Sequence, residues 1–167
     1  MLNLRKMKAS EYIAFSDYFI EDYATEIANN YGHSKEHAVS LAEKDLQRSL
    51  PEGIDTKDHV LLCIEVDGIE VDGIESSEFD KTKAVGYLWH CINKTDATTF
   101  IYDFYIFKSY RSKGYGKLAI AALEKSLAEL AIKQIKLRVA YHNKRALALY
   151  QEVGFMITGY NMSKNLL

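Results

Sequence analysis

The sequence predicts a mixed α/β fold, in which a β-hairpin precedes strands and helices that alternate along the chain. Two runs rich in β-branched and aromatic residues, at 59–66 and 84–92, predict the hairpin. Two further β-rich runs, at 98–107 and 135–141, enclose a helical segment, and another helical segment follows from Asn143. Such alternation is typical of a sheet that contains parallel strands joined by helices.

The first fifty residues predict a short strand and two helices. The opening LNLRKM is compatible with a strand, and Ser10 is expected to cap a helix that begins near Glu11. Apolar residues then recur at helical spacing as far as Ile27. A second helix is expected after Ser34, and Pro51 is expected to end it.

The rest of the chain completes the expected order of elements. The hairpin connector contains IEVDG twice, at 64–68 and 69–73, which we interpret as a small duplication that lengthens a strand or its turn. The segment 114–133 is expected to form a helix. Its predicted apolar face consists of Leu118, Ala119, Ala122, Leu123, Leu127 and Leu130. The last apolar run, 155–164, is expected to form a strand.

Length and charge limit the possible classes of function. The 167 residues suit one domain, 1–167. A net charge of -2 offers no overall attraction for nucleic acid or an anionic membrane, so neither is an expected partner. No apolar run approaches the roughly 20 residues of a membrane span, and a cytoplasmic location is therefore expected. The cysteines and histidines lack metal-ligand spacing, so no metal site is expected.

The stretch YRSKGYGK, residues 110–117, has the composition of an anion-binding loop. It lies between a predicted strand and a predicted helix, and a helix N-terminus attracts anions through its unpaired N–H groups. The glycines formally match a dinucleotide-binding pattern, but no acidic residue follows about 20 positions later to hold a ribose. No GxxxxGK[ST] motif occurs either. An anion site and a solvated basic turn both remain open from these residues alone.

Two separate motifs resemble the GNAT superfamily of acyl-CoA-dependent N-acetyltransferases, in particular its bacterial members. Residues 111–116, RSKGYG, resemble the R/Q-x-x-G-x-G/A pyrophosphate loop of that family. Residues 143–150, NKRALALY, together with Gly154 and Phe155, resemble its N-x-x-A-x-x-L-Y block. The resemblance covers about residues 85–160 and implies a GNAT-like fold, with a central mixed sheet, N-terminal helices and two C-terminal helices.

The resemblance implies acetyl-CoA as cosubstrate, bound in a cleft between two splayed parallel strands. Backbone groups of Tyr105 and Ile106 would pair with the pantetheine arm, and Asn143 would contact the cofactor from the far side. The pyrophosphate would be bound by the loop and its margin, which comprise Arg111, Ser112, Lys113, Gly114, Tyr115, Gly116 and Lys117.

The same resemblance assigns catalytic roles. Tyr150 matches the tyrosine that serves as general acid for the departing thiolate. Asp103 is the only carboxylate in the run 98–107 and is expected to be the general base, because a charged group in a central strand is costly unless it faces a cleft or a partner. Two alternatives remain open, a structural Asp103 paired with a helix or with Arg138, and an ordered water as base, since Tyr102 stands where some family members carry the acid.

These features predict an enzyme that acetylates a primary amine of a small molecule or peptide. The alternatives are a noncatalytic acyl-CoA sensor and nucleotide binding by a different α/β fold. The family fold places the first helix beside the amine, with Tyr18, Phe19 and Tyr23 as candidate wall residues. A homodimer formed through exposed β edges is also possible.

Overall fold

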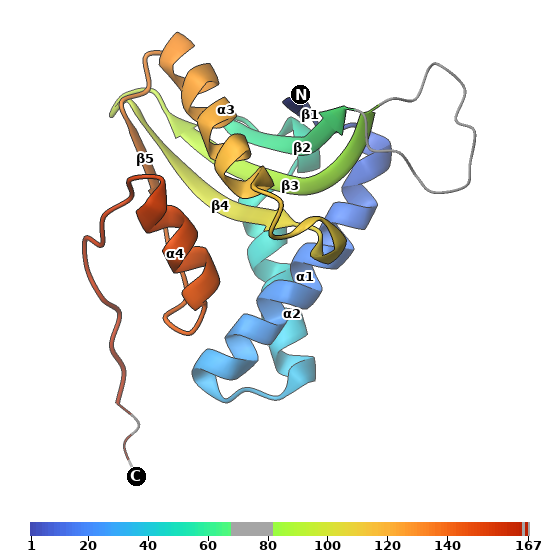
Figure 1. Ribbon diagram of the computed structural model, residues 1–167. Helices are drawn as coiled ribbons and strands as arrows, with labels where there is room; N and C mark the ends of the chain where they lie inside the picture. Colours follow the sequence, from blue (N-terminus) through green and yellow to red (C-terminus); the bar gives the residue numbers. More distant parts are fainter. Residues whose placement is uncertain (68–81, 165, 167) are drawn as a thin grey trace.

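The computed structural model describes residues 1–67, 82–164 and 166 and shows a twisted sheet with helices on both faces (Figure 1). Its elements in chain order are β1 (Leu2–Lys6), α1 (Ala9–Tyr31), α2 (Lys35–Ser49), a 3₁₀ turn (Gly53–Asp55), β2 (His59–Asp67), β3 (Thr82–Asn93), β4 (Thr98–Ile106), a second 3₁₀ turn (Lys108–Tyr110), α3 (Tyr115–Glu129), β5 (Gln134–Leu137) and α4 (Lys144–Glu152).

The sheet is mixed, as the sequence predicts. The five strands of the described part lie in the order β1-β2-β3-β4-β5. The first three pairings are antiparallel, and β4 and β5 are parallel, with α3 as the connecting helix. The predicted hairpin is formed by β2 and β3. The predicted α/β fold class is confirmed.

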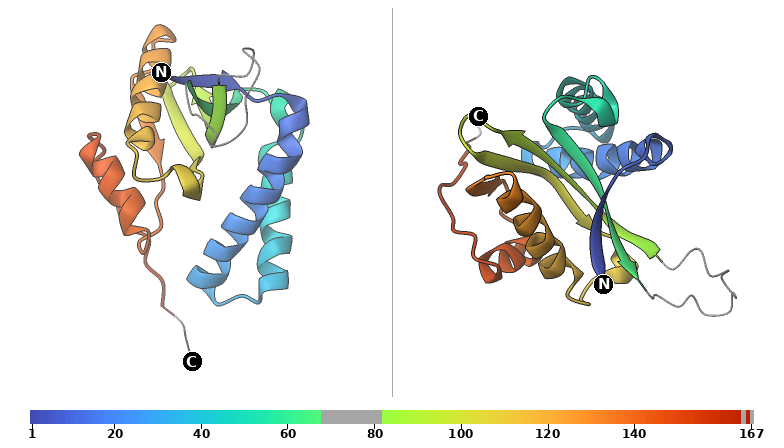
Figure 2. Two further views of the ribbon diagram at one scale, coloured as in Figure 1. Left: turned by 45° about the vertical axis from the view of Figure 1, so that its right-hand side comes forward. Right: turned by 90° about the horizontal axis from the view of Figure 1, so that it is seen from above.

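The two faces of the sheet carry different helices (Figure 2). Alternating residues of β2 point to opposite faces, as the pleat requires. Leu61 and Cys63 pack with Phe15 and Phe19 on the side of α1 and α2. Leu62 and Ile64 belong to the core on the side of α3 and α4. No helix within the described ranges is long and apolar enough to cross a membrane.

Ser34 and Asn143, after which the sequence predicts two helices, cap α2 and α4. The side chains of Ser34 and Asn143 accept hydrogen bonds from the backbone N–H groups of His37 and Ala146, at 3.3 and 3.2 Å. The predicted cap at Ser10 is wrong, because α1 begins at Ala9. Its first turn is held instead by Glu11, which accepts the N–H of Lys8 at 2.7 Å and is fixed by Arg5 at 2.8 Å.

The predicted apolar face of α3 is partly wrong. Ala119, Leu123 and Leu127 are buried, and Ile120, which the prediction omitted, is buried with them. Leu118 is exposed because it lies on the far side of the helix from this stripe. Leu130 is exposed because the helix ends at Glu129.

Two predicted strands differ from the structure. β5 ends at Leu137 rather than at residue 141, because β4 and β5 diverge and its ladder partner is lost. Residues 155–164 form no strand in the described part; they pair with no neighbouring strand, and Met156, Tyr160 and Met162 are exposed. The first four residues of the first IEVDG copy, 64–67, form the end of β2, whereas Gly68 and the second copy lie outside the described residues.

Candidate active site

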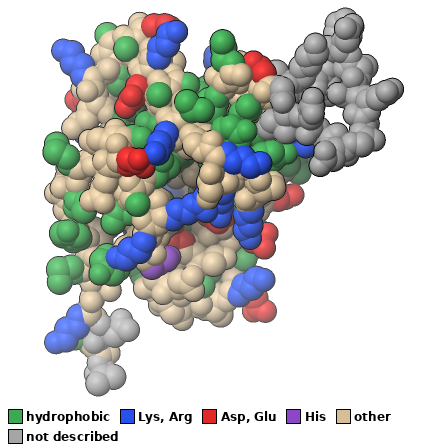
Figure 3. All heavy atoms as spheres, viewed as in Figure 1, with side chains coloured by type: hydrophobic (Ala, Val, Ile, Leu, Met, Phe, Trp, Pro, Cys, Tyr) green, Lys and Arg blue, Asp and Glu red, His purple; other side chains and the backbone are tan. Residues whose placement is uncertain are grey.

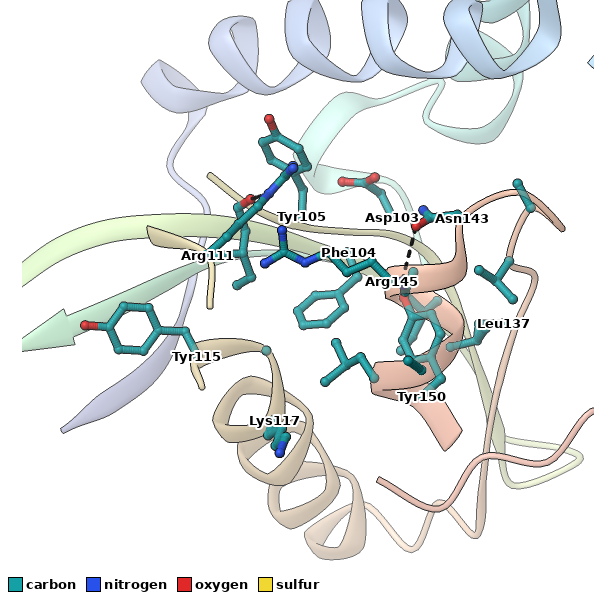
Figure 4. A pocket seen from close by; sticks show the side chains of 18 of the residues that line it. Asp103, Phe104, Tyr105, Arg111, Tyr115, Lys117, Leu137, Asn143, Arg145 and Tyr150 are labelled. Atoms are coloured by element: carbon teal, nitrogen blue, oxygen red, sulfur yellow. Dashed lines mark hydrogen bonds between the residues drawn. The ribbon is translucent and has the colours of Figure 1, made fainter. Parts of the chain in front are cut away.

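A cleft of about 530 Å³ opens where β4 and β5 separate. The two strands pair only from Thr98 to Ile101 of β4 and from Gln134 to Leu137 of β5. β4 continues to Ile106, so the second half of this strand has no parallel neighbour. The start of α3, together with α4 and α1, supplies the other walls (Figure 4). The expected splay of the two strands is therefore present, and the volume of the cleft suits a small-molecule ligand.

A β-bulge in β4 turns Asp103 toward α1. In the register with β3, Trp89 faces Asp103 and the next residue of β3 faces Ile101, so Tyr102 has no partner. Ile101 and Phe104 pack into the core on the α3 side. Tyr102 stacks on Trp89 at 4.7 Å, and Asp103 bonds to α1. Two consecutive side chains thus share a face, which regular alternation forbids and a bulge permits.

The Asp103 carboxylate is enclosed and only partly satisfied. The hydroxyl of Tyr18 donates to Oδ1 at 3.1 Å, whereas Oδ2 is buried without a hydrogen-bond partner among the described residues. The pKa of Asp103 is raised to about 7, chiefly by burial and in part by the nearby carboxylate of Asp22. Hydrogen bonds from Tyr18 and from the backbone of Phe104 act in the opposite direction. An aspartate in this state exchanges a proton near neutral pH.

The sequence left open an ion pair between Asp103 and Arg138, and this alternative is wrong. Arg138 Nη2 instead lies 2.9 Å from Glu26 Oε1 of α1, across the outer end of the cleft. The contact with a helix that the other structural alternative expects is present as the Tyr18 hydrogen bond, which by itself does not distinguish a structural carboxylate from a base. Asp103 lines the cleft, and its Oδ2 has no hydrogen-bond partner among the described residues.

Tyr150 projects from α4 into the same cleft (Figure 4). Its ring packs between those of Phe104 and Phe155, with centroids 6.4 and 5.4 Å away. Burial raises the pKa of the Tyr150 phenol, and the charge of Asp103 raises it further. The hydroxyl therefore keeps its proton at neutral pH and is available as a hydrogen-bond donor.

The loop before α3 has the geometry of an anion site. Gly114, which directly precedes the helix, has φ 81 and contributes no side chain that caps the first N–H groups of α3. A Cβ built there would meet no atom within 4 Å, so the cleft is open at this point. Ser112 also adopts a positive φ, of 61°. The first turn of α3 thus presents unpaired N–H groups to the cleft.

Arg111 fastens this loop to the end of β4. Its Nε donates to the carbonyl of Ile106 at 2.9 Å, and its guanidinium lies 5.0 Å from the ring centre of Tyr105. The carbonyl of Tyr105 itself lies beside Gly86 of β3, so Tyr105 borders the cleft through its side chain. The Ile106 carbonyl, one of the backbone groups of Tyr105 and Ile106 expected to pair with pantetheine, accepts the hydrogen bond of Arg111.

The other predicted cofactor residues are brought together with one exception. Lys113 does not line the cleft, and its ammonium lies 5.6 Å from the ring of Tyr110. Lys117 lines the cleft and is paired with Glu152. The predicted residues that line the cleft are Asp103, Tyr105, Ile106, Arg111, Ser112, Gly114, Tyr115, Gly116, Lys117, Asn143 and Tyr150.

Several residues of the cleft were not predicted. Arg145, two positions after Asn143, points into the cleft and donates to the Ser112 hydroxyl at 3.4 Å. Lys and Arg side chains gather on this face of the molecule (Figure 3). Asp22 and Glu26 line the side formed by α1. The spacing of four residues from Tyr18 through Asp22 to Glu26 is the signal that identifies this wall in the sequence.

Only one of the three aromatic residues expected beside the amine lines the cleft. Tyr18 does so, and its ring stacks on that of Tyr105 at 4.2 Å. Phe19 is buried against Trp89 in the core. The hydroxyl of Tyr23 bonds to Asp45 of α2 at 3.3 Å.

Comparison with known proteins decides the family. The model of the acetyltransferase (GNAT) family matches residues 44–155. The chain belongs to the GNAT acetyltransferase family. It is 31% identical over 165 residues to the uncharacterized N-acetyltransferase YycN of Bacillus subtilis, a match that covers 98% of this chain and 97% of YycN. The crystal structure of YycN superposes on the whole GNAT chain with a TM-score of 0.85 and is covered to 99%.

Further relatives of this GNAT protein carry named activities. A probable spermine N(1)-acetyltransferase of Bacillus subtilis subsp. natto is 35% identical over 83 residues, which is 49% of this chain and 47% of that protein. The PaiA N-acetyltransferase of Thermoplasma acidophilum, whose crystal structure contains coenzyme A, shares the fold with a TM-score of 0.67. It is 17% identical, with 96% of this chain and 93% of that chain covered. The predicted family and the enzyme class are confirmed.

Proposed function

We propose that this GNAT protein transfers the acetyl group of acetyl-CoA directly to a primary amine. The observation that carries the proposal is the convergence in one cleft of an anion-binding helix terminus, an unpaired buried carboxylate and a buried phenol. Each group suits one part of the substrate pair. The anion site suits the pyrophosphate, the carboxylate suits the amine, and the phenol suits the departing thiolate.

The cosubstrate fits the residues that are present. The N–H groups at the start of α3 would bind the pyrophosphate, and the open space at Gly114 lets the phosphates approach the backbone. Arg145 would add a full positive charge from the opposite wall. Beyond Ile101, the unpaired edge of β4 would receive the pantetheine arm by the hydrogen-bonding pattern of an added strand.

Asp103 would remove the proton that blocks attack by the amine. An alkyl ammonium with a pKa of about 10.4 must lose a proton before its nitrogen can form a bond to the thioester carbon. The Asp103 pKa of about 7 leaves a substantial ionised fraction at neutral pH, and its free Oδ2 can accept that proton. Tyr18 fixes the carboxylate through Oδ1.

Tyr150 would supply the proton that the leaving group needs. As the C–N bond forms and the C–S bond breaks, the electron pair of the latter goes to sulfur, and the phenol proton passes to the thiolate. The raised pKa of Tyr150 keeps this proton in place until the thiolate develops. Solvent then returns Asp103 and Tyr150 to their starting states.

The named relative supports a small-molecule acceptor. The protein with 35% identity over 83 residues is named for spermine acetylation, and spermine is a small polyamine. We therefore place a small primary amine ahead of a peptide as acceptor.

The proposal is tested by incubating the protein with acetyl-CoA and a panel of primary amines and measuring release of free thiol. We expect amine-dependent release. Asp103→Asn and Tyr150→Phe should each lower kcat by about 10²-fold or more. Tyr160→Phe, at an exposed position outside the cleft, is the matched control for the loss of a hydroxyl. Tight CoA binding without thiol release on any amine would indicate a sensor and refute the proposal.

A further inference from the structure

One face of α1 forms a carboxylate-bearing wall of the cleft. Tyr18, Asp22 and Glu26 are spaced by four residues, so their side chains follow one another along the same side of the helix, and all three line the cleft. Tyr18 meets Asp103 at the inner end of this row. From the reacting carboxylate outward, the cleft therefore offers Asp103, then Asp22, then Glu26.

The negative charge of Asp22 is not neutralised by an ion pair in the described part of the chain. Within the residues that the structure describes, no ion pair joins Asp22 to a cation. Partial burial raises the pKa of Asp22, and the charges of Arg111 and Lys108 lower it. The guanidinium of Arg111 is already bound to the Ile106 carbonyl and lies over the Tyr105 ring. Asp22 thus feels the charge of Arg111 but forms no direct ion pair with any described residue.

Glu26 is paired, but with an exchangeable cation. Its partner is Arg138, which follows β5. The side chain of Glu26 is 30% exposed and that of Arg138 is 46% exposed. Ion pairs between exposed side chains contribute little to stability, so a ligand ammonium can replace Arg138 on Glu26 at small cost. Of the other cleft-lining cations, Lys117 and Arg145 lie on α3 and α4, and Lys117 is paired with Glu152. Arg111 is the remaining cleft-lining cation whose charge acts on Asp22.

The spacing of the wall sets the kind of molecule it fits. Four residues advance an α-helix by about 6 Å, so the row extends over about 12 Å from Tyr18 to Glu26. We propose that the acceptor carries a second cationic nitrogen beyond the amine that is acetylated, and that Asp22 and Glu26 bind this second cation. The inference rests on the proposed function and adds the class of acceptor, an elongated diamine or polyamine.

The test compares two amines that share a four-carbon chain and differ in the second amino group and its charge, diaminobutane and butylamine, with acetyl-CoA as donor. We expect kcat/KM for diaminobutane to exceed that for butylamine by about tenfold or more, the value of one charge-assisted contact. Asp22→Asn combined with Glu26→Gln should remove this preference. Glu21→Gln, which removes one carboxylate charge at an exposed neighbour outside the cleft, should leave it intact.

Binding gives a second readout that does not depend on turnover. Calorimetric titration of diaminobutane into the CoA-bound protein should show affinity that the double substitution reduces by about tenfold. Equal kcat/KM values for the two amines, or binding unchanged by the double substitution, would overturn this inference and leave the proposed function standing. Charge-dependent binding of diaminobutane without thiol release on any amine would support the site and refute the proposed function.

Discussion

Replacing Asp103 by Asn should make the protein more stable at alkaline pH while it abolishes efficient turnover. Asp103 is held in a site that disfavours its charged form, with one carboxylate oxygen buried and unpaired. The Asn side chain has nearly the same shape, cannot ionise, and can still accept the hydrogen bond of Tyr18 at its amide oxygen. The substitution therefore removes the charge and keeps the contact.

The sign and size of the effect follow from the two pKa values of Asp103. Its pKa is about 7 in the folded protein and about 3.9 in an unfolded chain, so between these values the folded state binds more protons. Stability therefore falls as the pH rises from about 4 to about 7 and is then constant, with a total cost of at most about 4 kcal/mol. From about pH 5 to about pH 8 the cost grows by about 2 to 3 kcal/mol.

The assay is urea unfolding of both proteins at these two pH values. The free energy of unfolding of the variant relative to the parent should rise by about 2 to 3 kcal/mol between about pH 5 and about pH 8. Any pH-independent cost of the buried amide cancels in this difference. Asp17→Asn, at an exposed position of α1, is the matched control. A difference that stays constant or falls with pH would refute the account of Asp103 as a desolvated carboxylate.

Three further substitutions probe the walls of the cleft. Tyr18→Phe removes a hydrogen bond that lowers the pKa of Asp103, so the acid limb of the kcat/KM profile should move up by about one pH unit; an unmoved limb would contradict the role of the hydroxyl. Gly86→Ala places a Cβ 2.1 Å from a backbone oxygen of β4. It should lower the free energy of unfolding in urea by about 1 to 3 kcal/mol and weaken CoA binding. Gly159→Ala, whose added Cβ would lie in open space, should do neither. Gly114→Glu should reduce CoA affinity in calorimetry by more than tenfold and more than Gly114→Ala, which shares the backbone strain without the charge; equal effects would argue against an anion site.

The sequence predicts the elements of this fold because most of them follow local rules. Ser34 and Asn143 cap helices as their residue types suggest, and the hairpin and the parallel pair follow from β-rich runs and their helical crossover. The errors arise in segments whose structure depends on contacts with a distant part of the chain. Residues 155–164 have the composition of a strand, but a strand exists only when another strand pairs with it.

Most residues on the cofactor side of the cleft are also close together in the sequence. Gly114 and the residues around it form one continuous loop, so a short motif identifies most of this wall. Lys113 is the exception, because the backbone of the loop turns its side chain toward Tyr110. Which of two adjacent side chains faces the cleft depends on backbone φ values, which the residue type alone does not determine.

The residues on the amine side come from distant parts of the chain, so the sequence alone predicts few of them. The hydrogen bond between Tyr18 and Asp103 joins positions 85 residues apart. The orientation of Asp103 depends on the bulge at Tyr102, and a regular alternation would have sent neighbouring side chains to opposite faces. Asp22 gains its significance only when α1 is seen to pass along the cleft.

Transfer of labelled acetyl from acetyl-CoA is the most direct test of acetylation at this cleft. With the isotope in the acetyl carbonyl and diaminobutane as acceptor, nuclear magnetic resonance follows the label while the thiol is measured in parallel. The account predicts that the label appears in an N-acetyl product in an amount equal to the thiol released, and that Asp103→Asn slows both together. Label that stays on CoA, or that appears only as free acetate, would contradict it.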